Sequence, residues 1–178
     1  MGRTHELRLP FRIRLARADD LRALEWGGEF WSHRALIEDA FARQTRGEVA
    51  MLIADVNDYP GGQAWIDFAR KADEGIAVIW AVRVHPMLRR QGLALRLMIA
   101  AEEAIARRGV GLAELGVEPH NHPARSLYRR LGYREAGAQT ERTRWVRPDG
   151  RPLELFVRVR LMRKELPRHA TVVRRTGS

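Results

Sequence analysis

The stretch RRQGLA, residues 89–94, decides the fold prediction because it joins a strand pattern to a helix pattern through a glycine. The preceding run IAVIWAVRV (76–84) is typical of a buried strand, and residues 92–108 carry apolar side chains at helical spacing. A helix start has free N–H groups and a positive dipole end, so two arginines there oppose helix stability unless an anion binds. Gly92 lets an anion approach the backbone closely. The pattern favours a phosphate site, with an ordinary basic loop as the alternative.

The rest of the chain divides into strands and helices in the order βααβββαβαββ. Ser32 is expected to cap the second helix. If the turn between the third and fourth strands centres near residues 72–73, Asp67 lies opposite Val78. This order predicts an α/β (α+β) fold with a mixed, mostly antiparallel central sheet flanked by helices. Strands are expected at 11–16, 48–55, 62–69, 76–84, 111–117 and in a hairpin over 142–162, and helices near 18–26, 33–45, 92–108 and within 121–133.

The length and composition indicate one domain. With 178 residues and an apolar fraction of 45%, the chain can build a substantial core, expected over 1–166. Residues 167–178 are polar and basic, and we expect a flexible tail there. The absence of cysteine excludes disulfides, thiolate metal sites and a cysteine nucleophile. The chain lacks the apolar runs of a signal peptide or membrane span, so we expect a soluble, cytoplasmic protein with no membrane partner.

The net charge of +10 is unevenly distributed along the chain. Residues 1–74 carry 11 basic and 13 acidic side chains, whereas residues 75–178 carry 21 basic and 9 acidic ones. This asymmetry predicts an anionic partner for the second half, either a nucleic acid or a phosphorylated small molecule. The sequence does not determine the oligomeric state, and a homodimer is kept as one option.

A second segment, NHPARSLYRRLGY (121–133), places Asn121, Ala124 and Tyr128 on one stripe of a helix. The two segments together resemble the GNAT superfamily of N-acetyltransferases. The resemblance is specific over about 82–133 and extends, by element order, over about 11–163. It rests on Arg89-x-x-Gly92-x-Ala94 after one strand and Asn121-x-x-Ala124-x-x-Leu127-Tyr128-x-x-x-Gly132-Tyr133 after the next.

This resemblance implies a GNAT-like fold with acetyl-CoA, or another acyl-CoA, as donor and an amine as acceptor. It implies that the strands carrying the two segments splay apart, with the thioester in the gap between them. Asn121 would hold the cofactor arm, and Tyr128 would protonate the departing thiolate. The donor would further contact the backbone of Val82, Arg83 and Val84 along its pantetheine arm, and Arg89, Arg90, Gln91, Gly92, Leu93 and Ala94 around its pyrophosphate.

The proton acceptor is the open part of the site. Family members carry a glutamate near the position of Val78 or at the position of Gly116, and this chain has neither. Glu118, expected on the same strand face as Gly116, and Asp67 are the candidate replacements. Either side chain is equally compatible with a solvated or salt-bridged acid. Because no cysteine is present to carry the acyl group, direct transfer in a ternary complex is favoured.

Three aromatic residues, Trp26, Phe30 and Trp31, lie between the first two helices, a region that closes over the acceptor in the family. Core packing is the alternative for them. Six acids against two arginines within 19–39 suit a cationic amine. The His120-x-His122 pair lacks further metal ligands at an obvious spacing, and no metal is expected.

The leading hypothesis is therefore an N-acetyltransferase acting on a primary amine. A small-molecule amine and a peptide or protein amine both remain open as acceptors. One alternative is an acyl-CoA-binding sensor without turnover, since the expected glutamates are missing. Another is a basic nucleic-acid-binding module, although no groove-reading motif is recognisable and the arginines are dispersed.

Overall fold

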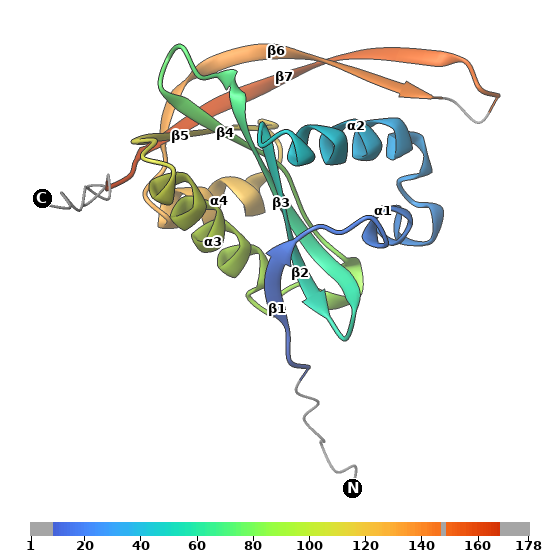
Figure 1. Ribbon diagram of the computed structural model, residues 1–178. Helices are drawn as coiled ribbons and strands as arrows, with labels where there is room; N and C mark the ends of the chain where they lie inside the picture. Colours follow the sequence, from blue (N-terminus) through green and yellow to red (C-terminus); the bar gives the residue numbers. More distant parts are fainter. Residues whose placement is uncertain (1–8, 147–148, 168–178) are drawn as a thin grey trace, which may run out of the picture.

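The computed structural model describes residues 9–146 and 149–167. A seven-stranded sheet crosses this part of the chain in the order β1-β2-β3-β4-β5-β7-β6, with helices on both faces (Figure 1). Neighbouring strands are antiparallel except for the central parallel pair of β4 and β5. The strands are β1 Arg12–Leu15, β2 Val49–Val56, β3 Tyr59–Lys71, β4 Ile76–Val84, β5 Leu112–Val117, β6 Arg134–Val146 and β7 Pro152–Glu165.

Four α-helices and three short 3₁₀ turns complete the described segments. They are α1 Asp20–Ala23, η1 Trp26–Gly28, η2 Trp31–His33, α2 Arg34–Thr45, η3 Pro86–Leu88, α3 Leu93–Arg107 and α4 His122–Arg130. The predicted order βααβββαβαββ is confirmed, as is the mixed, mostly antiparallel sheet. In the described residues, no helix is long and apolar enough to cross a membrane.

Two local predictions for the segment between β1 and α2 are wrong. The first helix spans only Asp20–Ala23 rather than 18–26, because Trp26 already takes φ of 45° and Gly27 and Gly28 follow with φ of 69° and 98°, outside the helical region. Ser32 does not cap α2. It lies inside η2, its hydroxyl is 3.2 Å from His33 Nδ1, and His33 occupies the N-cap position without a side-chain cap. A 3₁₀ turn leads directly into the helix, so Ser32 comes too early to cap it.

The sheet separates two apolar clusters, and the alternation of strand residues assigns each side chain to one of them. The larger cluster lies under α3 and α4 and includes Ile66, Ile79, Leu97 and Leu115. The smaller cluster lies under α2 and includes Ile37, Met51, Ile53 and Trp65. Two adjacent strands of the sheet, β4 and β5, therefore present one face to each layer of helices.

The β6–β7 hairpin is longer than predicted and reaches beyond the sheet. β6 begins at Arg134 rather than near 142, and its partner runs to Glu165. Figure 1 shows the pair arching over the side of the sheet that carries α2, and the turn η2 packs against β6. Residues 147–148 of the predicted hairpin and residues 168–178 of the predicted tail lie outside the described residues. The hairpin therefore covers part of the side of the sheet on which α2 packs.

Candidate active site

The central feature of the site is the point where β4 and β5 stop pairing. Their parallel register runs from Ile76↔Leu112 to Ile79↔Leu115 and ends there, although β4 continues to Val84 and β5 to Val117. Carboxyl ends of parallel strands meet at the same edge of a sheet. The segments that lead into α3 and α4 therefore both start beside this opening, which we call the β4–β5 gap (Figure 1).

The start of α3 is built to accept an anion. Gly92 is its N-cap in the left-handed region, with φ of 79°, and a Cβ there would meet no atom within 4 Å. No acidic residue lies in the first turn, and no side chain caps it. Arg89 Nε donates a hydrogen bond to the Val84 carbonyl at 3.2 Å. Within the described segments, neither Arg89 nor the exposed Arg90 forms an ion pair. Free N–H groups thus lie next to two arginines that form no ion pair among the described residues, a combination that suits an anion.

The start of α4 carries the second motif. Asn121 is its N-cap, and the Oδ1 atom accepts a hydrogen bond from the Ala124 backbone N–H at 3.2 Å. That bond uses the carbonyl end of the amide and leaves its NH₂ group available as a donor. Two turns further along the stripe from Asn121, Tyr128 packs into the larger cluster with Leu115 and Val117.

Tyr128 is 6% exposed, and none of the described groups hydrogen-bonds to its hydroxyl. Burial raises the pKa of Tyr128 to about 12, so the phenol remains protonated at neutral and mildly alkaline pH. The neighbouring ring of Tyr133 lies 6.1 Å away, centroid to centroid, and is equally buried in the core. The Tyr128 oxygen is not among the buried atoms that lack a partner, so the ring is buried while the hydroxyl reaches the surface, with no partner among the described residues.

Sequence reasoning missed Glu141, whose carboxylate reaches the β4–β5 gap from β6. A Cβ placed on Gly116 would lie only 3.0 Å from Glu141 Oε1 and 3.1 Å from Val159 Cγ2. Gly116 is the first residue of β5 beyond the paired segment, so the carboxylate stands at the mouth of the gap. Glu141 accepts a hydrogen bond from Gln139 Nε2 at 2.9 Å and has no ion pair in the described structure.

The predicted register of Asp67 is confirmed, since this residue lies opposite Val78. Its carboxylate, however, is 4% exposed and fully engaged: Arg43 pairs with it at 2.8 Å, and two backbone N–H groups donate to it. Glu118 follows the end of β5, is largely exposed and lies 2.8 Å from His120 Nε2. A further acid next to Val78 in the register, Glu114, is buried between Lys71 and Arg163.

The three aromatic residues predicted near the acceptor have different surroundings. Trp26 is buried, and its indole N–H donates to the Pro60 carbonyl at 2.8 Å, so it anchors the fold. Phe30 is half-buried and carries the Arg83 guanidinium 4.4 Å from its ring centroid. Trp31 is 40% exposed at the start of η2. Two of the six acids within 19–39 form ion pairs inside the protein, Asp20 with Arg14 and Glu25 with Arg34.

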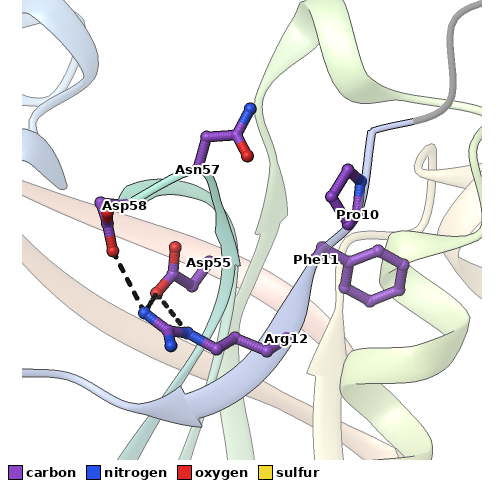
Figure 2. A pocket seen from close by; sticks show the side chains of 6 residues that line it. All are labelled: Pro10, Phe11, Arg12, Asp55, Asn57 and Asp58. Atoms are coloured by element: carbon purple, nitrogen blue, oxygen red, sulfur yellow. Dashed lines mark hydrogen bonds and ion pairs between the residues drawn. The ribbon is translucent and has the colours of Figure 1, made fainter.

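One further hollow on the surface lies apart from this site. Figure 2 shows a hollow at the β1–β2 edge, where Arg12 is paired with both Asp55 and Asp58. Its charged groups satisfy one another, and none of its lining residues belongs to the gap, so we assign it no role. Within the described segments, no group of three or more histidine and acidic side chains is placed to hold a metal ion.

Comparison with known sequences gives a consistent result. The family model described as acetyltransferase (GNAT) family matches residues 15–133. The mycothiol acetyltransferase of Clavibacter sepedonicus is 31% identical over 132 residues, which is 70% of this chain and 42% of that protein. The mycothiol acetyltransferase of Clavibacter michiganensis subsp. michiganensis is 30% identical over the same shares. The chain thus spans less than half the length of the curated relatives it matches.

Solved structures share the fold at lower sequence identity. The ribosomal-protein-S18-alanine N-acetyltransferase of Escherichia coli superposes with a TM-score of 0.66 at 22% identity, covering 92% of this chain and 99% of that one. An acetyltransferase from Salmonella typhimurium, solved with its cofactor acetyl-CoA, gives a TM-score of 0.65 at 22% identity over 90% and 96% of the two chains. Since the family model covers most of the sequence and the solved folds agree, the chain belongs to the acetyltransferase (GNAT) family.

Proposed function

We propose that this protein transfers the acetyl group of acetyl-CoA to a primary amine by direct attack in a ternary complex. The observation that carries the proposal is the β4–β5 gap, because the two strands that border it lead into the uncapped start of α3 and into α4, which carries Tyr128. The first feature suits a diphosphate, and the second suits a leaving group that needs a proton. The α3 start and the helix that carries Tyr128 both follow the carboxyl ends of two parallel strands, which is the usual place for a ligand in such sheets.

The donor would be held by backbone and charge rather than by a closed pocket. The residues proposed for the pantetheine arm, Val82 to Val84, lie on the part of β4 that β5 leaves unpaired. The residues proposed for the pyrophosphate, Arg89 to Ala94, include the free N–H groups of the α3 start. The donor amide of Asn121 is oriented by the capping bond to Ala124, which fixes its side chain.

The reaction needs one proton removed and one supplied. The amine nitrogen forms a bond to the acyl carbon, the bond from that carbon to sulfur breaks, and the amine proton leaves to a base. Tyr128 supplies a proton to the departing sulfur. Since its pKa is about 12, deprotonation of Tyr128 does not limit activity at mildly alkaline pH.

We propose Glu141 as the proton acceptor in preference to the two acids predicted from the sequence. Asp67 is committed to Arg43 and to two backbone N–H groups, and Glu118 extends beyond the end of β5 toward His120. Glu141 alone of these three has no cationic partner among the described groups and stands at the mouth of the gap. A base is needed because a lysine-like amine with a pKa near ~10.4 is neutral in only about one molecule in ~2,500 at pH 7.

The basic surface gives the nucleic-acid alternative little support. Several arginines of the second half are engaged within the protein, since Arg125, Arg129 and Arg160 all form ion pairs with Glu135. A sensor that binds acyl-CoA without turnover differs from the enzyme only in the chemical step. A thiol-release assay with acetyl-CoA and a panel of amines and peptides distinguishes the enzyme from the sensor and identifies the acceptor class.

Acetyl-CoA is expected to stabilise the folded protein by about 2.7 kcal/mol at ~100 times its dissociation constant, because it binds the native state only. Thermal unfolding followed with and without the donor measures this shift. Desulfo-CoA, which lacks the reactive thiol, is a matched ligand that keeps the phosphates and is expected to stabilise the protein similarly. An unchanged melting temperature at saturating CoA would remove the donor assignment.

A further inference from the structure

A bulge in β4 turns Arg83 toward the α2 face of the sheet. Between the pairs Trp65↔Trp80 and Gln63↔Arg83, β4 has one residue more than β3, and Ala81 takes φ of 51° at this point. Val82 and Val84 consequently pack with the larger cluster, whereas Trp80 packs with the smaller one under α2. Arg83 and Trp80 therefore project to the same side, from the part of β4 that β5 leaves unpaired.

The Arg83 guanidinium is half-buried and lacks an acidic partner in the described structure. Its contact is the face of Phe30, 4.4 Å from the ring centroid. Burial lowers the pKa of Arg83 from its ordinary value, and Glu29 only partly offsets this from a distance. By comparison, the partly buried arginines Arg14 and Arg43 each pair with two carboxylates. A cation–π contact alone is weak compensation for a desolvated charge.

Three buried polar atoms on the same face also lack hydrogen-bond partners. They are Gln63 Oε1, opposite Arg83 on β3, and the indole nitrogens of Trp65 and Trp80. The Gln63 and Trp65 side chains are only 3% and 1% exposed. Nearly all buried polar groups in folded proteins are hydrogen-bonded, so a cluster of three beside an unpaired guanidinium indicates a ligand that completes it.

The donors in this cluster define the ligand's chemistry. A guanidinium group and an indole N–H both require an acceptor, and a planar carboxylate matches the guanidinium fork. Burial and the nearby Arg83 lower the pKa of His33 to about 4, so His33 adds no second positive charge at neutral pH. A single positive charge among aromatic side chains favours a monoanion over a phosphate group.

We propose that Arg83 and Trp80 bind a carboxylate of the acceptor, and that the acceptor is a small amine of the amino-acid type. This inference rests on the proposed function, because it assigns the acceptor of the same site. The carboxylate lies on the α2 face, and the amine points into the gap toward Glu141. Gln63 Oε1 accepts a hydrogen bond from an N–H group of the same ligand.

The test compares L-amino acids with their C-terminal amides as acceptors in the thiol-release assay. The parent protein is expected to favour at least one acid over its amide by about 10- to 100-fold in kcat/KM, the weight of one charge-assisted hydrogen-bonded pair. Arg83→Met, which keeps the chain length and the contact with Phe30, is expected to reduce this ratio to near one. Arg96→Gln is the matched control, because it removes an exposed arginine of α3 outside the assigned site and should leave the ratio unchanged.

Two further measurements distinguish the ways in which the proposal fails. N-acetyl amino acids should stabilise the CoA-loaded protein more than their amides do, whether or not turnover is fast. Arg83→Met should unfold at the same temperature as the parent or higher, because it removes an unpaired charge; a clearly lower melting temperature would assign Arg83 a structural role. If CoA stabilises the protein but no acid is preferred in either readout, the carboxylate site is wrong and the proposed function stands. If CoA gives no shift, the proposed function itself fails.

Discussion

Gly92→Glu is expected to abolish the stabilisation of this protein by acetyl-CoA. The glycine N-caps α3, and a side chain at this position would point into open space that we assign to the diphosphate. A carboxylate about 4 Å from a phosphate charge at an effective dielectric constant near 20 costs roughly 4 kcal/mol, or about 10³-fold in affinity. Calorimetric titration and the thermal shift with CoA both measure this loss.

The substitution also places a side chain at φ of 79°, which strains any residue with a Cβ. Gly109 provides a matched control, because it has φ of 75° after the end of α3 and equally open surroundings, yet lies at the opposite end of that helix. Gly109→Glu should lower the melting temperature to a similar extent and keep the full shift with CoA. Equal CoA shifts in Gly92→Glu and the parent would exclude Gly92 from the donor site.

The sequence alone was sufficient for the parts of the fold that local patterns determine. The helix after Gly92 and the helix after Asn121 begin where their glycine, asparagine and proline signals indicate, since capping is a short-range effect. The pairing of Asp67 with Val78 followed from the length of one tight turn. The parallel β4–β5 pair followed from the order of elements, because a helix connects the two strands.

The acceptor side of the site depends on long-range register and could not be predicted in this way. Glu141 reaches Gly116 only because β6 pairs with β7 far from the motif, and no spacing rule links the two positions. Arg83 would face α3 if β4 alternated regularly, and one extra residue at the bulge reverses its direction. Asp67 and Glu118 were plausible bases as carboxylates on or next to the right strands. The partner of Asp67, Arg43, is 24 residues away on α2 and could not be predicted by spacing, whereas Glu118 contacts its near neighbour His120.

Glu141→Gln and Tyr128→Phe are each expected to reduce turnover by about 10²–10⁴-fold while leaving CoA binding nearly unchanged, the usual contribution of one general base or acid. Tyr128→Phe keeps the buried ring, and because a thiolate is a tolerable leaving group its loss should fall near the low end. Glu118→Gln and Asp67→Asn are the matched controls, each removing one negative charge from a carboxylate near the same strands. Rapid-quench kinetics at saturating substrates isolates the chemical step for all four variants.

The pattern across acceptors tests the assignment of the base directly. Loss of the base should matter more for amines with a pKa near ~10.4 than for those near ~8, whose deprotonation costs roughly 3 kcal/mol less at pH 7. The double variant Gly116→Glu with Glu141→Ala returns a carboxylate to the same space from β5, since a Cβ on Gly116 would lie 3.0 Å from the present Glu141 Oε1. This variant should regain part of the activity that Glu141→Ala loses. Full activity in Glu141→Gln would exclude Glu141 as the base, and full activity in Tyr128→Phe would make that tyrosine a packing residue of the core.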